Sequence, residues 1–204
     1  MKKEILFVIL AVSLGVIYYF FGTQYSSLKN YPPRNSTIVA FGDSLVEGYG
    51  STAGNDFVSV LSKKLNKPII NLGISGNSTE DGLRRINEVI LRKPGTVIVL
   101  FGGNDYLRNI PKSETFANLR QIISTLQADG SMVVLLGIQG GIFRDDYKTD
   151  FENLSKETGA LYVPNVLLGL FGNSKYMSEV VHPNDLGYAK IADKVYDAIK
   201  DYVW

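Results

Sequence analysis

The chain has 204 residues, of which 45% are hydrophobic and 20% are charged, and its formal net charge is +1. This composition predicts one globular domain with a sizeable core, and the lack of a basic tract excludes an electrostatic footprint for nucleic acid. With no cysteine and a single histidine, the chain cannot build a thiolate or poly-histidine zinc site. Carboxylate-bound Mg²⁺ or Ca²⁺ stays open in principle, but no loop has the ligand spacing for either ion, so we expect no metal and no other cofactor.

An apolar run over residues 5–21 follows two lysines near the N-terminus. At about 1.5 Å per residue, a helix of this length reaches roughly 26 Å, slightly short of the ~30 Å hydrocarbon core of a bilayer. The run is therefore a transmembrane helix or the core of a signal peptide. No good small-x-small cleavage site follows it, which favours an uncleaved membrane anchor over residues 1–22.

Residues 23–35 contain serine, asparagine and the pair Pro32-Pro33 without a sustained hydrophobic period, which is typical of a linker. We therefore expect one folded domain over residues 36–204. The two N-terminal lysines favour a cytoplasmic N-terminus, so this domain is expected outside the cytoplasm, with the membrane as its partner through the N-terminal helix. A secreted or periplasmic protein after signal cleavage is the alternative.

The domain begins with a β-branched and aromatic run over residues 37–41, which stops abruptly at Gly42-Asp43-Ser44-Leu45. Such a run is typical of a buried parallel strand, and glycine followed by Asp-Ser suits a sharp turn out of a sheet. Ligands bind where the strands of an open α/β sheet end, so Ser44 is a candidate nucleophile. On its own, however, a Gly-Asp-Ser turn is more often structural than catalytic.

From this strand onward, apolar β-type runs alternate with segments of helical spacing, which predicts an α/β fold with a parallel sheet covered on both faces. Five strands are expected, over residues 37–41, 68–72, 96–101, 132–138 and 160–163. Among the helices, one is expected after a cap at Ser78 or Thr79, one after Ser113, and the last after Asn184. Their apolar stripes are expected to face the core.

Three later segments accompany the Ser44 turn: Asn71-Leu-Gly-Ile-Ser-Gly-Asn77, Phe101-Gly-Gly-Asn-Asp105 and Glu179-Val-Val-His-Pro-Asn184. In order and spacing, the four blocks resemble those of the GDSL esterases, also called SGNH hydrolases. The resemblance is closest to the small single-domain thioesterase, lysophospholipase and arylesterase branch, and covers the chain from about residue 37 onward. It implies a flavodoxin-like three-layer α/β/α sandwich with a five-stranded parallel sheet.

A serine hydroxyl becomes a good nucleophile only when a base takes its proton, and the usual base is an imidazole. His182 is the one histidine of the chain and lies in a polar loop, and the resemblance carries the role of base onto it. The family typically has aspartate three residues before this histidine, where the present chain has Glu179. We expect Glu179 to orient the imidazole as the acidic member of the triad, with a solvated loop carboxylate as the alternative.

The resemblance also implies an oxyanion hole, a set of donors that stabilises the negative charge of the tetrahedral intermediate. Its expected members are the backbone N–H groups of Ser44 and Gly76 and the side-chain amide of Asn104. The structural alternatives are that Gly76 only permits a positive φ and that Asn104 only caps a turn.

The substrate implied by the resemblance is a small acyl ester or thioester of the lipid, lysophospholipid or arylester type, cleaved through an acyl-enzyme. Two alternatives remain: an O-acetyl esterase that acts on a cell-envelope glycan, and a non-catalytic ligand-binding module on the same fold. Five apolar residues flank the motifs and are candidates to line an acyl pocket, with core packing as the alternative: Leu45, Leu107, Ile110, Ile142 and Phe143.

Overall fold

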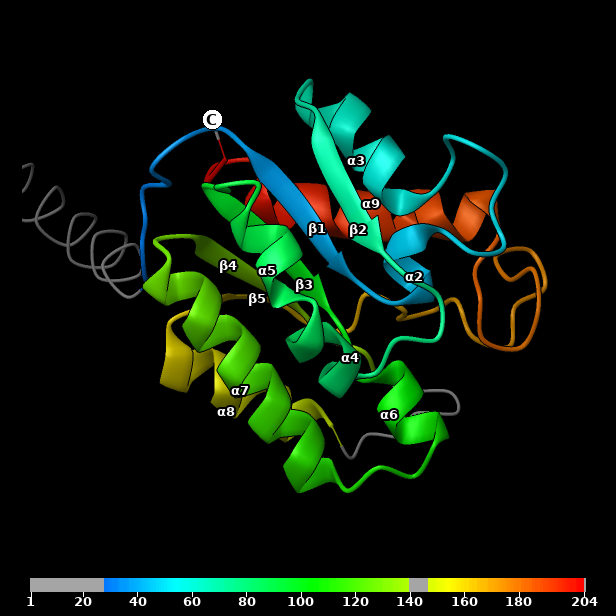
Figure 1. Cartoon of the computed structure of the whole chain (residues 1–204). Coiled ribbons are helices and arrows are strands. Elements are labelled where there is room, and N and C mark those ends of the chain that lie inside the picture. Colours follow the sequence, from blue (N-terminus) through cyan, green and yellow to red (C-terminus); the bar gives the residue numbers. More distant parts are fainter. Residues whose placement is uncertain (1–27, 140–146, 204) are drawn as a thin grey trace, which may run out of the picture.

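The computed structural model describes residues 28–139 and 147–203, and within these ranges a central parallel sheet is covered by helices on both faces (Figure 1). The strands lie in the order β2-β1-β3-β4-β5, which is the flavodoxin-like order. Their bounds are Ile38–Gly42 for β1, Ile69–Gly73 for β2, Thr96–Leu100 for β3, Met132–Leu136 for β4 and Leu161–Val163 for β5. The five strands predicted from the sequence are thus confirmed, each within about two residues at its ends.

The three central strands β1, β3 and β4 are buried along their whole length, as their β-branched and leucine-rich sequences predict for strands covered on both faces. Helices α3 and α9 pack together on one face, and α4, α7 and α8 pack together on the other. The helices run as follows: α2 Ser44–Glu47, α3 Phe57–Leu65, α4 Thr79–Arg84, α5 Ile86–Ile90, α6 Gly103–Leu107, α7 Lys112–Ala128, α8 Lys148–Thr158 and α9 Asp185–Ile199.

Side-chain caps set the starts of several helices. Ser78 caps α4 and forms a reciprocal capping box with Asp81, and Asn184 caps α9 by accepting a hydrogen bond from a backbone N–H three residues on. The predicted cap at Ser113 is wrong, because α7 already begins at the preceding residue, with Pro111 before it and no side-chain cap. Proline fixes φ near the helical value and so suits the start of a helix without a polar cap.

The described part of the expected linker lies against the domain. The Asn30 side-chain amide donates to the backbone carbonyls of Gln127 and Ser131 at 2.8 and 2.9 Å, and Arg34 forms an ion pair with Asp129 at 2.7 Å. These contacts tie the segment before β1 to the end of α7. A truncated protein that keeps them should therefore be better packed than one that begins at β1.

No helix within residues 28–139 and 147–203 has the length and apolar character needed to cross a membrane. The anchor predicted over residues 1–22 lies outside the described residues.

Candidate active site

The candidate nucleophile lies where β1 ends and the short helix α2 begins, at the edge of the sheet to which the strand arrows of Figure 1 point. The turn needs Gly42, because a Cβ atom there would lie only 2.3 Å from a methyl group of Val46. Asp43 caps α2 by accepting a hydrogen bond at 3.0 Å from the backbone N–H two residues on. Ser44 is the first residue of the helix, and only 9% of its surface is exposed.

A serine, a histidine and a glutamate form a continuous hydrogen-bonded chain. His182 Nε2 lies 2.8 Å from Ser44 Oγ, and His182 Nδ1 is hydrogen-bonded to Glu179 Oε1. Because a carboxylate only accepts, the proton of the neutral imidazole is assigned to Nδ1, which leaves Nε2 free to accept the proton of the serine hydroxyl. The three residues predicted as a triad therefore lie together, in the arrangement that nucleophilic catalysis requires.

The histidine loop is held by contacts that the sequence analysis missed. The backbone N–H and the hydroxyl of Ser178 both donate to the His182 carbonyl at 2.9 Å, and the Tyr49 ring lies 4.6 Å from the imidazole, centroid to centroid. Asp185, at the start of α9, accepts hydrogen bonds at 2.7 Å from the backbone N–H and the hydroxyl of Thr52. The loop that follows α2 is thereby fastened to the helix that follows His182.

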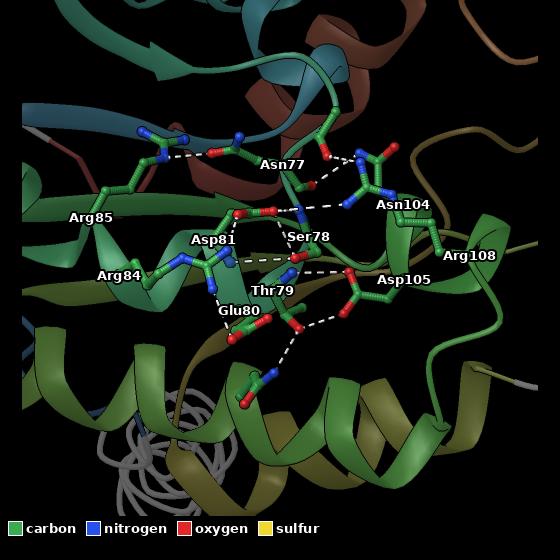
Figure 2. A network of polar contacts seen from close by, with 12 residues as sticks. Asn77, Ser78, Thr79, Glu80, Asp81, Arg84, Arg85, Asn104, Asp105 and Arg108 are labelled. Atoms are coloured by element: carbon green, nitrogen blue, oxygen red, sulfur yellow. Dashed lines mark hydrogen bonds and ion pairs between the residues drawn. The ribbon is translucent and has the colours of Figure 1, made fainter.

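The predicted oxyanion donors also gather at this edge. Asn104, in the first turn of α6, donates one amide hydrogen to the Asn77 carbonyl at 3.0 Å (Figure 2) and keeps a second one available. Gly76 has a φ of +80°. Arg108 donates to the Gly76 carbonyl at 2.7 Å and so holds the peptide group between Gly76 and Asn77. Within the described residues, the backbone N–H groups of Gly76 and Ser44 donate to no other group.

Two buried carboxyl groups, Asp43 and Asp105, each stand next to a candidate site residue in the sequence and carry no predicted role. Burial raises the pKa of Asp43 to about 7, against the opposing hydrogen bond from the Leu45 N–H, and the charge of Asp105 raises it further. Asp105 accepts a hydrogen bond at 2.9 Å from the Thr79 backbone N–H and another from the Thr79 hydroxyl (Figure 2). The hydrogen bonds between Thr79 and Asp105 join the start of α4 to α6 and so connect the segments that carry Gly76 and Asn104.

A cavity of about 220 Å³ opens at the serine and is lined by the candidate catalytic residues together with apolar and small ones. Of the candidate pocket residues, Leu45 and Leu107 are among its lining residues and Ile110 is not. Ile142 and Phe143 lie outside the described residues. Tyr49 and Val181, which the sequence analysis did not single out, also line the cavity. Within the part of the chain that the structure describes, no group of three or more His, Asp or Glu side chains could hold a metal ion.

Comparison with known families matches most of the chain to a family of lipases and acylhydrolases. Residues 40–190 match the model of the GDSL-like lipase/acylhydrolase family. The esterase TesA of Pseudomonas aeruginosa is 26% identical over 176 residues, which cover 80% of this chain and 88% of that protein. The thioesterase 1/protease 1/lysophospholipase L1 of Escherichia coli is 28% identical over 166 residues, which cover 77% and 80% of the two chains.

Solved structures agree with the sequence matches. The psychrotrophic esterase EstA from Pseudoalteromonas sp., in a crystal structure inhibited by monoethylphosphonate, superposes with a TM-score of 0.74 at 28% identity. The match covers 82% of this chain and 98% of that one. The fold around the candidate site therefore recurs in proteins of similar sequence.

Proposed function

The chain belongs to the GDSL-like lipase/acylhydrolase family and is a serine hydrolase that acts on esters or thioesters, and we propose that Ser44, His182 and Glu179 are its catalytic triad. In this proposal, the backbone N–H groups of Ser44 and Gly76 and the amide of Asn104 form the oxyanion hole. The observation that carries the assignment is the Ser44 Oγ to His182 Nε2 contact of 2.8 Å, with Glu179 on the opposite ring nitrogen.

The reaction follows from this geometry. His182 takes the proton of Ser44 as Oγ attacks the substrate carbonyl, and Glu179 stabilises the imidazolium that forms. The negative charge that develops on the carbonyl oxygen falls among the oxyanion donors. His182 then gives its proton to the leaving alcohol or thiol, which departs and leaves an acyl group on Ser44. Water, activated by the same histidine, attacks the acyl-enzyme, and the acid is released with Ser44 restored.

Substitution of the nucleophile and the base tests the triad. Ser44→Ala and His182→Ala should each lower kcat by about 10⁴-fold or more, and the double variant should be little worse than either, because members of one catalytic unit are strongly non-additive. Steady-state hydrolysis of a p-nitrophenyl ester gives the three values. If the two single losses in kcat multiplied in the double variant, Ser44 and His182 would not act in a shared step.

We further propose that the acyl group is short. The cavity of about 220 Å³ is smaller than the roughly 300–1,000 Å³ of sites for drug-sized ligands, and Leu107, which lines it, is itself exposed. A short acyl group would fill this space, with the leaving group in solvent. The same observation favours a second candidate, O-deacetylation of a cell-envelope glycan.

A panel of p-nitrophenyl esters of increasing chain length, run beside an acyl-CoA and an acetylated glycan, tests this substrate class. We expect kcat/KM to be highest for short acyl chains. A kcat/KM that rises steadily up to long acyl chains would overturn the short-acyl proposal and favour a lysophospholipid or fatty acyl thioester as substrate.

The apolar run over residues 5–21 supports a proposal about location: that the uncleaved segment 1–22 anchors the catalytic domain at a membrane, outside the cytoplasm. The full-length protein should then stay in the membrane pellet after carbonate extraction. Recovery of a mature protein that lacks this segment would replace the anchor with a cleaved signal and a secreted or periplasmic enzyme.

A further inference from the structure

One buried cation connects the ends of the first two strands with the loop that carries Gly76. Arg85 lies between α4 and α5, and its side chain is only 10% exposed. Its Nη2 donates to the carbonyls of Gly42 and Leu72, both at 2.8 Å, and its Nε donates to Asn77 Oδ1 at 2.7 Å. A single planar group therefore binds two backbone carbonyls and one side chain, which belong to three separate stretches of the chain.

A second hydrogen bond of Asn77 connects Arg85 to the proposed oxyanion hole. The Asn77 side chain accepts from Arg85, and the Asn77 backbone carbonyl accepts from Nδ2 of Asn104 at 3.0 Å. Figure 2 shows Asn77 between Arg85 on one side and Asn104 on the other. The other end of the guanidinium holds the carbonyl of Gly42, two residues before Ser44. Arg85 thus reaches toward two of the proposed oxyanion donors without lining the cavity.

We infer that Arg85 is a positioning residue for the oxyanion hole: it fixes Asn77, and through the Asn77 carbonyl it fixes the direction of the Asn104 amide. This inference rests on the proposed role of Asn104. Its physical basis is preorganisation, since a donor that already points at the developing charge costs no reorganisation when the reaction occurs.

Arginine suits this place because its planar guanidinium presents several donors in a rigid arrangement, which the single ammonium of lysine cannot reproduce. The group lies over the Phe41 ring, 4.5 Å from the ring centroid. Within the described residues, its Nη1 makes no hydrogen bond and has Glu88 as an ion-pair partner at 3.6 Å. The cost of burying this charge is offset mainly by the two backbone carbonyls that accept from Nη2.

The neighbouring Arg84 provides a matched control. Its side chain is 60% exposed and pairs with Glu80 and Asp81 (Figure 2). Among the described residues, it forms no hydrogen bond or ion pair with Asn77 or Asn104. Arg85→Lys and Arg84→Lys are therefore the same chemical change at adjacent positions, and only the first removes the contacts to the oxyanion loop.

The experiment is a double-mutant cycle read by ester hydrolysis. Arg85→Lys should lower kcat on the order of 10- to 10²-fold with little change in KM, because misplacing a catalytic group has effects of this size. Asn104→Ala should lower kcat by about 10²–10³-fold. Combining Arg85→Lys with Asn104→Ala should cost little beyond Asn104→Ala alone, since the first acts through the second. Arg84→Lys should match the parent enzyme.

Three results would overturn the inference: a parental kcat for Arg85→Lys, a loss confined to KM, or losses that multiply in the double variant. Thermal unfolding checks that each variant is folded. If Arg85→Lys does not fold, Asn77→Ala, which removes only the side-chain acceptor, decides the question by the same cycle with Asn104→Ala. Failure of the proposed function would look different, because Asn104→Ala or Ser44→Ala would then keep the parental kcat.

Discussion

Glu179 reaches the histidine despite a side chain one methylene longer than the aspartate that the family typically has at this position. The hydrogen bonds from Ser178 to the His182 carbonyl close the loop tightly, and the longer carboxylate lies against Nδ1 within it. The Glu179 side chain is nevertheless 49% exposed. Solvent therefore screens its charge, and its main contribution is expected to be orientation of the ring.

Glu179→Gln tests this contact. Loss of the carboxylate should lower kcat, with the 10⁴-fold effect of the corresponding change in chymotrypsin-type enzymes as a rough upper scale. Glu179→Asp, which keeps a carboxylate, should retain more of the rate than Glu179→Gln. A parental rate in Glu179→Gln would remove the carboxylate from the triad.

Asp43 predicts a pH dependence of stability. Its pKa is about 7 in the folded protein, against an ordinary value of 3.8, because the carboxyl is buried. The folded state therefore binds this proton more tightly than the unfolded chain does. The resulting stabilisation is complete below about pH 4 and is lost as the pH rises through about 7.

Asp43→Asn keeps the cap of α2 but cannot ionise. Relative to the parent protein, the free energy of unfolding of this variant should therefore rise between pH 5 and pH 8, by on the order of 1–3 kcal/mol. Urea unfolding at both pH values measures the difference, and Asp197→Asn, at an exposed carboxylate, is the matched control. A difference that is the same at both pH values would contradict a buried, protonated Asp43.

At the scale of elements, the loop after α2 and the start of α9 act as one unit. Thr52 holds Asp185 through two hydrogen bonds of 2.7 Å, and the Tyr188 hydroxyl in α9 donates to the Tyr49 carbonyl at 2.7 Å. The Tyr49 ring in turn lies against His182. These contacts set where the histidine loop lies relative to the nucleophile.

Thr52→Val removes the hydroxyl bond and keeps the side-chain volume. We expect it to lower kcat by up to about 10-fold through looser placement of His182, with little change in KM. Thr52→Ser restores the hydroxyl and should recover most of the rate. Equal kinetics for the valine and serine variants would show that the hydrogen bond from the Thr52 hydroxyl to Asp185 does not position the base.

The elements themselves differ in how far local sequence predicts them. The central strands and the caps at Ser78 and Asn184 are local signals, namely β-branched runs and a polar residue before a helix, and the structure confirms them. The apolar stripe after Ser78 predicted one helix, whereas the structure has α4 and α5, interrupted at Arg85. Arg85, at the interruption, donates to carbonyls of β1 and β2, and no local sequence pattern could indicate these contacts.

The whole molecule explains why residues far apart in sequence meet. The strand order β2-β1-β3 within the sheet sets β1 beside β3, so that Ser44, after β1, and Asn104, after β3, emerge at the same edge of the sheet. His182 is 138 residues from Ser44 and reaches it from the loop before α9. Motif order alone led to the proposed site residues. Contacts such as Thr52 with Asp185 depend on how loops from distant segments pack, and for this reason no sequence pattern predicted them.

Covalent labelling tests the central claim, that the fold activates Ser44 for nucleophilic attack, most directly. The folded protein is treated with a fluorophosphonate probe, and the modified residue is mapped by peptide mass spectrometry. We predict one adduct, on Ser44, that is absent from Ser44→Ala, much slower to form in His182→Ala and absent from heat-unfolded protein. Ester hydrolysis without an adduct on Ser44, or an adduct that persists in Ser44→Ala, would contradict the assignment of Ser44 as the nucleophile.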